Sequence, residues 1–377
     1  YPVRFCSWLR GVWAVIKCDC TKSHGLGPVT LPSFFPKRQP AMTMPMSPET
    51  RAALLDGLRT CLEAAHVRTD PDSAQHYGRD WTRLYTPNPL AVVLPGSIEQ
   101  VQNLVRYACE QRLALVPSGG RTGLSGAAVA CQGEVVVSME RMNRILDFDP
   151  TDRSVTCQAG VITESLQNFA REQGLYYPVD FAARGSSHIG GNIATNAGGI
   201  KVVRYGLTRD WVTGLKVVTG SGELLDLNRG LIKNASGYDL RHLFIGSEGT
   251  LGVITKIILK LIPAPEAKAT ILALFKRVED TAEAVSGIVA AKIVPSTIEF
   301  MDQASIRCSE QANPMGIPED VEGLLLIEID GNADAIQTLA QKIKAVLIEH
   351  NASDVKLTRD PVEADKLWQA RRVVSQA

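Results

Sequence analysis

The sequence of 377 residues lacks the features that mark several large classes of protein. Lys+Arg and Asp+Glu each number 40, so there is no general electrostatic attraction to nucleic acid or to an anionic membrane. Aromatic residues make up only 6%, and no apolar run approaches the ~20 residues of a transmembrane helix. Neither a G-x-G-x-x-G fingerprint nor a Walker A loop occurs, so the recognised nicotinamide-dinucleotide and P-loop signatures are absent. The composition is that of a globular protein.

The eight cysteines show no CxxC pair and no regular spacing. Scattered thiols in a chain of this size indicate a reducing compartment, and we expect a cytoplasmic protein. A zinc site is a weaker alternative, because Cys18-Asp19-Cys20 has no second pair and only His24 nearby.

The two ends of the sequence differ from the rest. The first residue is Tyr1, and residues 1–41 show no helix or strand period, so we expect residues 1–45 to be an unstructured appendage. Ser47-Pro48-Glu49 is a helix N-cap and first-turn signature that predicts a helix over 50–65. The last predicted helix begins at Pro361 and still continues at Ala377, so we expect a chain truncated at its C-terminus.

Strands and helices alternate from residue 87 onward. Up to residue 264 the hydrophobic pattern predicts strands at 90–94, 113–116, 135–138, 154–158, 215–219 and 253–261, and helices at 97–112, 162–172 and 239–244. Pro263-Ala264-Pro265 then breaks the chain, and the glycine density falls. Beyond this break we expect strands at 270–275, 296–300 and 324–329, with helices at 279–290, 302–311 and 333–350.

A glycine-rich stretch, Pro117–Gly126, directly follows a predicted strand. Its glycines permit a positive φ and can turn several N–H groups toward one point, which makes an anion-binding nest. Arg121, Thr122 and Ser125 add further donors. A phosphate cradle and a plain surface loop both remain open for this segment taken alone.

Two more glycine-rich stretches follow, at 185–199 and at 246–252. Small residues and amide side chains dominate the first of them, which suits close approach to a flat polar ring system. The second lies between a predicted helix and a predicted strand. Each of the two, taken alone, is also explained by helix–strand packing.

The order of the three stretches, with Tyr177-Pro178-Val179-Asp180 and Arg204-Tyr205-Gly206 between them, resembles one flavoprotein family. It is similar to the FAD-binding domain of the vanillyl-alcohol oxidase / p-cresol methylhydroxylase superfamily. Within it, the chain resembles the D-2-hydroxyacid dehydrogenases, which include D-2-hydroxyglutarate dehydrogenase, D-lactate dehydrogenase and the glycolate oxidase D subunit. The resemblance covers residues 75–377. It implies an α+β fold, with a two-subdomain FAD-binding domain over 46–264 and an incomplete α/β cap domain over 265–377 whose open sheet carries helices on one face.

The resemblance also implies which residues bind FAD. The first stretch matches the loop that holds the pyrophosphate, the second lines the flavin ring and ribityl chain, and the third meets the cofactor through backbone groups. In some relatives a histidine after the paired glycines of the first loop bonds covalently to the flavin. Arg121 occupies that position, so FAD is expected to be held non-covalently. The implied residues are Pro117, Ser118, Gly119, Gly120, Arg121, Thr122, Gly123, Leu124, Ser125, Gly190, Gly191, Asn192, Thr195, Asn196, Gly199, Glu248, Gly249, Gly252 and Ile254.

For the substrate, Leu367-Trp368-Gln369-Ala370-Arg371 resembles the family's Leu-Trp-x-x-Arg segment. The resemblance implies that Arg371 grips the substrate carboxylate and that Ser375, one helical turn further on, assists it. A solvated helix face is the alternative for Arg371. The family's H-x-x-x-G-N-x-H motif has no match, so the catalytic residue is unknown and the ligands of the expected divalent metal lie outside this chain.

Four further residues have weaker assignments. His188 lies inside the flavin-lining stretch, but a catalytic role for it is the less favoured interpretation. His242 is expected to be a packing residue of its helix. Lys201 and Arg204 are expected near either the cofactor or the cap.

The resemblance implies a flavin-dependent dehydrogenase that oxidises a D-2-hydroxy acid to the 2-keto acid by hydride transfer to FAD. Because no nicotinamide fingerprint is present, electrons would pass to a quinone or an electron-transfer flavoprotein. The alternatives are a truncated FAD-binding protein without catalytic activity and, less favoured, a sugar or aldonolactone oxidase of the same superfamily. The expected partner is a small 2-hydroxy acid and not nucleic acid, while peripheral membrane contact and a homodimer are left open.

Overall fold

The computed structural model describes residues 46–373, and the predicted appendage lies outside them. The described residues form sheets of four, five, two and four strands. By compactness the chain divides into two units. The first holds the described residues up to Arg141 together with Val218–Glu223 and Gly249–Val253, and the second holds Met142–Val217, Leu224–Glu248 and the residues from Ile254 onward.

The first unit is built on a four-stranded sheet in the order β1-β2-β4-β3. Strands β2, β4 and β3 are parallel, and β1 runs antiparallel to β2. Tyr77 packs in the core with Val92, Val116 and Val136 of the sheet. The elements are α1 (Pro48–Cys61), η1 (Ala64–His66), β1 (Val67–Arg68), α2 (Pro71–Tyr77), β2 (Ala91–Val93), α3 (Ile98–Gln111), β3 (Leu115–Ser118) and β4 (Val135–Ser138).

Helix α3 shows how sequence determines structure in this unit. Ser97 caps its N-terminus by accepting a hydrogen bond from the backbone N–H of Gln100, as predicted. Val101, Leu104, Val105 and Ala108 recur at helical spacing and are fully buried, which stabilises by about 2 kcal/mol per large side chain. Helix α1 is likewise capped by Ser47, but it ends at Cys61 and not near residue 65, because Leu62 is extended and the turn η1 follows.

A five-stranded sheet in the order β5-β6-β10-β8-β9 follows. Strand β6 pairs antiparallel with both β5 and β10. Helix α4 buries Leu166 and Ala170. The elements are β5 (Ile145–Asp149), β6 (Ser154–Gln158), α4 (Thr163–Glu172), β7 (Leu175–Tyr176), η2 (Ala182–Gly185), α5 (Ile189–Ala194), α6 (Val202–Tyr205), η3 (Thr208–Asp210), β8 (Val212–Thr219), β9 (Leu224–Leu227), α7 (Arg241–Phe244), β10 (Gly252–Lys260) and β11 (Ile262–Pro263).

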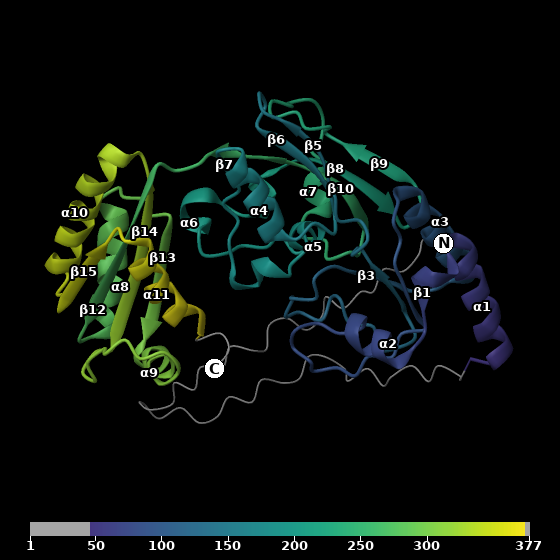
Figure 1. The fold of residues 1–377 in the computed structure, drawn as a ribbon, viewed down its shortest axis with the longest axis horizontal. Coiled ribbons are helices and arrows are strands. Elements are labelled where there is room, and N and C mark those ends of the chain that lie inside the picture. Colours follow the sequence, from purple (N-terminus) through teal and green to yellow (C-terminus); the bar gives the residue numbers. More distant parts are fainter. Residues whose placement is uncertain (1–45, 374–377) are drawn as a thin grey trace. The chain divides into compact units, whose positions relative to one another are not determined.

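After β11 the chain alternates strands and helices as predicted, and its four strands form an antiparallel sheet in the order β13-β14-β12-β15 (Figure 1). Strand β14 lies in the interior of this sheet and its run of leucines is buried. The elements are β12 (Ala267–Phe275), α8 (Val278–Ala290), β13 (Thr297–Asp302), α9 (Gln303–Ala312), β14 (Gly323–Gly331), α10 (Ala333–Glu349), β15 (Asp354–Thr358) and α11 (Pro361–Val373).

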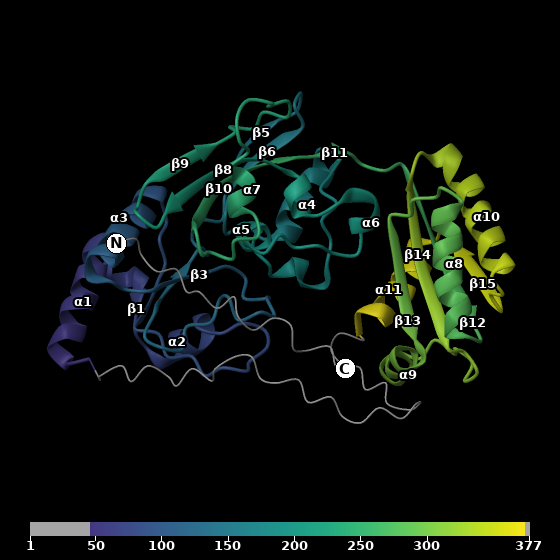
Figure 2. The ribbon, with the colours of Figure 1, turned by 180° about the vertical axis from the view of Figure 1, so that it is seen from behind.

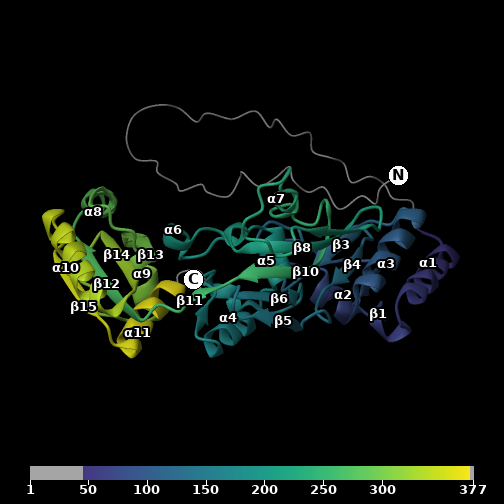
Figure 3. The same cartoon turned by 90° about the horizontal axis from the view of Figure 1, so that it is seen from above.

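Both faces of this sheet carry helices, so the expectation of helices on one face is wrong. Helices α8 and α10 pack against Leu325 and Ile327 on one face. The other face packs Leu324 and Leu326 with Ile306 of α9 and Trp368 of α11. Figures 2 and 3 show α10 and α11 on opposite sides of the strands. The reason is the unbroken apolar run in β14, whose successive side chains point to opposite faces that both need cover.

None of the helices within residues 46–373 is both long and apolar enough to cross a bilayer. The described cysteines Cys61, Cys109, Cys131, Cys157 and Cys308 are free thiols.

Candidate cofactor and substrate sites

The first loop leaves β3 at Ser118 and turns sharply. Its backbone adopts a left-handed conformation at Arg121 (φ +58°) and at Gly126 (φ +82°). A Cβ added at Gly123 would meet no atom within 4 Å, so the backbone there borders open space. The Ser118 hydroxyl is buried and has no hydrogen-bond partner among the described residues. A buried polar atom without a partner, beside an open glycine-rich turn, fits a loop that binds a polar ligand such as a phosphate.

Arg121 folds back over this loop. Its Nη1 donates to the Gly119 carbonyl oxygen at 3.1 Å, its Nη2 lies 3.0 Å from His76 Nε2, and its guanidinium lies 4.9 Å from the centre of the Tyr77 ring. Burial lowers the pKa of Arg121, and Glu140 and Tyr77 act in the opposite direction. The side chain still carries its charge at neutral pH, so it adds a cation to the predicted anion cradle.

The far end of the loop is held by a buried carboxylate that the sequence analysis missed. Asp80 Oδ2 accepts a hydrogen bond from the Gly126 backbone N–H at 2.9 Å, and Oδ1 accepts from the Thr82 N–H at 3.0 Å. The Trp81 N–H donates to the Gly123 carbonyl at 3.2 Å. The sequence does contain a signal for this arrangement, because Asp70-Pro71 is an N-cap followed by proline and predicts the start of α2. This helix brings residues 76–82 beside the loop.

In the second stretch, Gly190 and Gly191 serve different purposes. A Cβ on Gly190 would lie 2.6 Å from the Cβ of Ala159, so only glycine allows α5 to pack here. A Cβ on Gly191 would meet nothing within 4 Å. The open side of α5 at Gly191 is therefore where a flat ligand could approach the backbone.

The polar side chains of this stretch shape the protein itself. Asn192 is buried and its Nδ2 donates to Thr163 Oγ1 at 2.6 Å. Thr195 Oγ1 donates to the Gly191 carbonyl at 3.0 Å, and Asn196 Oδ1 accepts from the Arg209 N–H at 3.0 Å. In this structure these three side chains position the backbone, and their contact with a cofactor stays a prediction.

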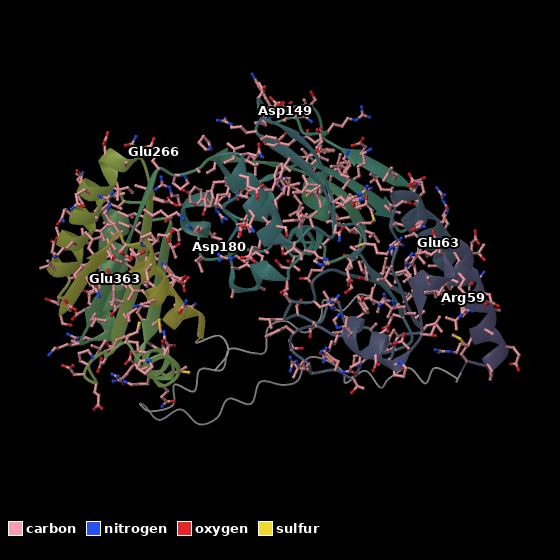
Figure 4. All side chains as sticks on the ribbon, in the orientation of Figure 1. Arg59, Glu63, Asp149, Asp180, Glu266 and Glu363 are labelled. Atoms are coloured by element: carbon pink, nitrogen blue, oxygen red, sulfur yellow. The ribbon has the colours of Figure 1, made fainter. Side chains whose placement is uncertain are left out.

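Gly199 joins the second stretch to the Tyr177–Asp180 motif. It has a φ of +130°, and a Cβ there would lie 2.2 Å from the Asp180 carbonyl oxygen. The Ile200 N–H donates to the same carbonyl at 3.0 Å. The Asp180 carboxylate, labelled in Figure 4, accepts a hydrogen bond from Arg184 at 2.9 Å. Two motifs that are separate in the sequence are thus one structural element.

The third stretch is divided between the two units: its residues up to Glu248 belong to the second unit, and those from Gly249 onward belong to the first. In the second unit, the N–H groups of Gly246 and Glu248 donate to the carbonyls of Ile193 at 3.0 Å and Ala194 at 2.8 Å, at the end of α5. In the first unit, Gly249 (φ +76°) lies so close to Pro117 that a Cβ would be 3.1 Å from its Cγ. Gly252 and Ile254 are buried at the start of β10.

Arg371 lies on α11 and pairs with Glu299 of β13, with 2.7 Å between Nε and Oε2. Its side chain is 31% exposed and that of Glu299 is 17% exposed, so Arg371 is partly buried and ion-paired in this structure. An arginine has five N–H donors, and the bond through Nε leaves the two Nη groups to bind a carboxylate. Ser375 lies outside the described residues.

The remaining singled-out residues have protein partners. His188 is buried and precedes α5, where its carbonyl accepts from the Asn192 N–H at 2.9 Å. His242 is partly exposed and 3.5 Å from Asp239, so it is not the packing residue that was expected. Lys201 and Arg204 contact carboxylates of β14, in agreement with the second of their two predicted places. Within residues 46–373 no three His, Cys, Asp or Glu side chains gather as a metal site.

Two family models match the chain. The FAD binding domain matches residues 89–228, and the C-terminal domain of FAD linked oxidases matches residues 264–377. The D-2-hydroxyglutarate dehydrogenase of Xanthomonas citri pv. viticola is 48% identical over 85% of this chain and 68% of its own length. That of Stutzerimonas stutzeri is 62% identical over 57% of this chain and 47% of its own length. The glycolate oxidase subunit GlcD of Bacillus subtilis is 39% identical over 78% of this chain and 63% of its own length.

Solved structures show the same fold. An alkyldihydroxyacetonephosphate synthase has a TM-score of 0.73 at 22% identity, over 85% of this chain and 67% of its own. A p-cresol methylhydroxylase with bound substrate has a TM-score of 0.71 at 15% identity, over 87% of this chain and 72% of its own. The chain therefore belongs to the family of FAD-linked oxidoreductases that contains these dehydrogenases and glycolate oxidase subunits, and it carries an FAD-binding domain. It spans 47% to 68% of the length of the three curated relatives.

Proposed function

We propose that this chain binds FAD non-covalently and that the protein oxidises a D-2-hydroxy acid to the corresponding 2-keto acid. The observation that carries the proposal is the first loop after β3, where a left-handed Arg121, an open Gly123 and a buried Ser118 hydroxyl without a described partner suit the binding of an anion. This loop lies inside the part of the chain that matches the FAD binding domain. The reaction is supported by the names of three relatives, two of which are D-2-hydroxyglutarate dehydrogenases and one a glycolate oxidase subunit.

The proposal assigns each stretch a part of the cofactor. Residues 117–126 hold the pyrophosphate through backbone N–H groups and Arg121. The backbone beside Gly191 faces the flavin, and residues 248–254 close the site with backbone groups. When bound, FAD supplies the group that accepts a hydride. Arginine and not histidine follows Gly119-Gly120, so the residue at this position cannot bond to the flavin, which supports the proposed non-covalent binding.

Arg371 is assigned to the substrate. Its Nη groups bind the carboxylate and orient the neighbouring C–H bond, while Glu299 fixes the arginine through Nε. The proposal includes Ser375 as an assisting hydroxyl. It gives a quinone or an electron-transfer flavoprotein as the electron acceptor, because the sequence has no nicotinamide fingerprint. A cytoplasmic location is supported by the free thiols. Membrane contact and a homodimer are not part of the proposal.

The test is reduction of the flavin in the absence of oxygen. The FAD-loaded protein is mixed with D-2-hydroxyglutarate, D-lactate or glycolate, and with the L-enantiomers of the first two as matched controls. The proposal predicts that one of the first three acids bleaches the flavin absorbance bands and that the L-enantiomers do not. Bands that persist with all three would contradict the proposed activity and would favour an FAD-binding protein without it.

A further inference from the structure

We propose that His76 is a positioning residue for the cofactor site, which holds the Arg121 guanidinium over the first loop and makes the retention of FAD depend on pH. The inference rests on the proposed function, because it takes residues 117–126 as the pyrophosphate site. His76 lies on α2, 45 residues before Arg121, and no sequence motif connects the two.

Three contacts join the loop to the segment that begins at His76. Nη2 of Arg121 lies 3.0 Å from Nε2 of His76, in the first half of the loop. The Trp81 N–H meets the Gly123 carbonyl at 3.2 Å in its middle, and the Asp80 carboxylate meets the Gly126 N–H at 2.9 Å at its end. Residues 76–82 therefore support the loop along its length. Among the side chains in these contacts, only that of His76 is of a type whose ordinary pKa lies near neutral pH.

Arg121 needs such support because its backbone is left-handed, which is unfavourable for a residue with a side chain. Its guanidinium is held by the Gly119 carbonyl, the His76 ring and the face of Tyr77. Tyr77 is itself fixed, because its hydroxyl donates to Glu140 at 3.0 Å. Described residues engage two of the five N–H donors of Arg121, which leaves the others for phosphate oxygens.

The contact itself fixes the protonation state of His76. A guanidinium can only donate hydrogen bonds, so Nε2 of His76 must accept, and the neutral ring carries its proton on Nδ1. A doubly protonated ring has no acceptor and repels Arg121. Burial lowers the pKa of His76, and the cation of Arg121 lowers it further.

The other charged groups facing the ring are Glu140, which raises this pKa, and Arg79 and Arg68, which lower it. The net direction is downward, so the ring is neutral at pH 7 and becomes charged only below its ordinary value of about 6.5. Acid then breaks the contact with Arg121. FAD affinity should therefore fall as the pH drops through the pKa of His76.

The experiment measures the dissociation constant of FAD by flavin fluorescence at about pH 7.5 and about pH 5.5. The variants are H76F, which fills the site without an acceptor, and H76Q, which keeps an acceptor oxygen but cannot titrate. H66F is the matched control, since His66 is in the same unit and pairs with Glu63 instead. Circular dichroism verifies that each variant is folded.

The inference predicts that H76F binds FAD about tenfold more weakly at pH 7.5, as expected for a lost hydrogen bond to a charged group. H76Q should stay close to the wild type at pH 7.5 and lose the acid dependence that the wild type and H66F show. H76F with wild-type affinity, or H76Q with the same acid dependence as the wild type, would overturn it. A wild type that binds no FAD at pH 7.5 would instead overturn the proposed function and the inference with it.

Discussion

Gly191 and Gly199 belong to the same stretch of sequence, but the structure gives them different constraints. Gly199 is left-handed and lies against the Asp180 carbonyl, whereas Gly191 borders open space on α5. Gly199 is thus required by the protein fold. Gly191 is not, and a ligand that approaches α5 explains it better.

Substituting each glycine by alanine separates these two constraints. Gly199→Ala should lower the free energy of unfolding by about 2–4 kcal/mol, because its Cβ overlaps a backbone oxygen and its φ is unfavourable. Gly191→Ala should change it by less than about 1 kcal/mol but weaken FAD binding about tenfold. Urea denaturation and flavin titration measure the two effects. Equal FAD affinity in Gly191→Ala and the wild type would remove this residue from the cofactor site.

Arg371→Ala should leave FAD bound and reduce kcat/KM for the D-2-hydroxy acid about a hundredfold, because charged hydrogen bonds to the carboxylate are lost. Steady-state kinetics and the flavin spectrum report the two properties separately. Arg359→Ala, at an exposed arginine before α11, is the control and should have little effect. Loss of FAD from the Arg371 variant would show a structural role for this residue instead.

The contacts of a single side chain could be predicted from the sequence where its partner is a few residues away in the chain. The caps Ser47 and Ser97 were predicted from their own sequence context and are confirmed. The contacts of Arg121 with His76 and of Gly126 with Asp80 join residues 45 and 46 positions apart, so no local pattern encodes them. They depend on how α2 is placed by the core.

Helix α6 and strand β14 are joined by a buried group of charges. Lys201 Nζ lies 2.7 Å from Glu328, and its side chain is 5% exposed. Asp330 is fully buried, accepts a hydrogen bond from the Tyr205 hydroxyl at 2.8 Å and lies 3.5 Å from Arg204. Burial acts to lower the pKa of Lys201, but Glu328 and Tyr176 outweigh it, so the net direction is upward. The lysine is therefore charged in the folded protein, and each charge depends on its partner.

Lys201→Met should lower the free energy of unfolding by about 3 kcal/mol, because it leaves Glu328, whose side chain is only 14% exposed, without its cation. Combining it with Glu328→Gln should cost less than the sum of the two single changes. Lys342→Met, at an exposed position on α10, serves as the control. Strictly additive effects in urea denaturation would show that the pair is not coupled.

The sheet of β12 to β15 has helices on both faces, although helices on one face were expected. Trp368 of α11 lies on one of these faces, and its substitution tests how much α11 contributes to covering it. Trp368 is 6% exposed and packs with Leu324 and Leu326. Trp368→Ala should lower the free energy of unfolding by about 3–5 kcal/mol. Val362→Ala, on the same helix but 66% exposed, should change it by less than about 0.5 kcal/mol. Similar small effects in both variants would mean that α11 does not cover this face.

Elements with a strong period were predicted to within a few residues, and weak ones were missed. Strands β4 and β6 have the predicted bounds, α3 is shorter than predicted by one residue at each end, and α4 begins one residue later than predicted. Helix α5 was missed because two glycines give it little helix propensity, and its packing against Ala159 decides its conformation. Strand β15, with the sequence DVKLT, has an exposed alternating pattern that becomes a strand only by pairing with β12.

For the chain taken together, the order of the three glycine-rich stretches was the decisive signal. Each stretch alone is compatible with ordinary packing. Their order led to the FAD-binding family, which the family models and relatives confirm. The domain limits at 46–264 and 265–377 and the individual binding residues stay predictions.

The most direct measurement is the absorbance spectrum of the purified chain, before and after acid precipitation. We predict the two absorbance bands of a bound flavin, with or without reconstitution by added FAD, and full release of FAD into the supernatant when acid unfolds the protein. Flavin that stays with the precipitate would contradict non-covalent binding. A spectrum without flavin bands even after added FAD would contradict the assignment of this chain as an FAD-binding protein.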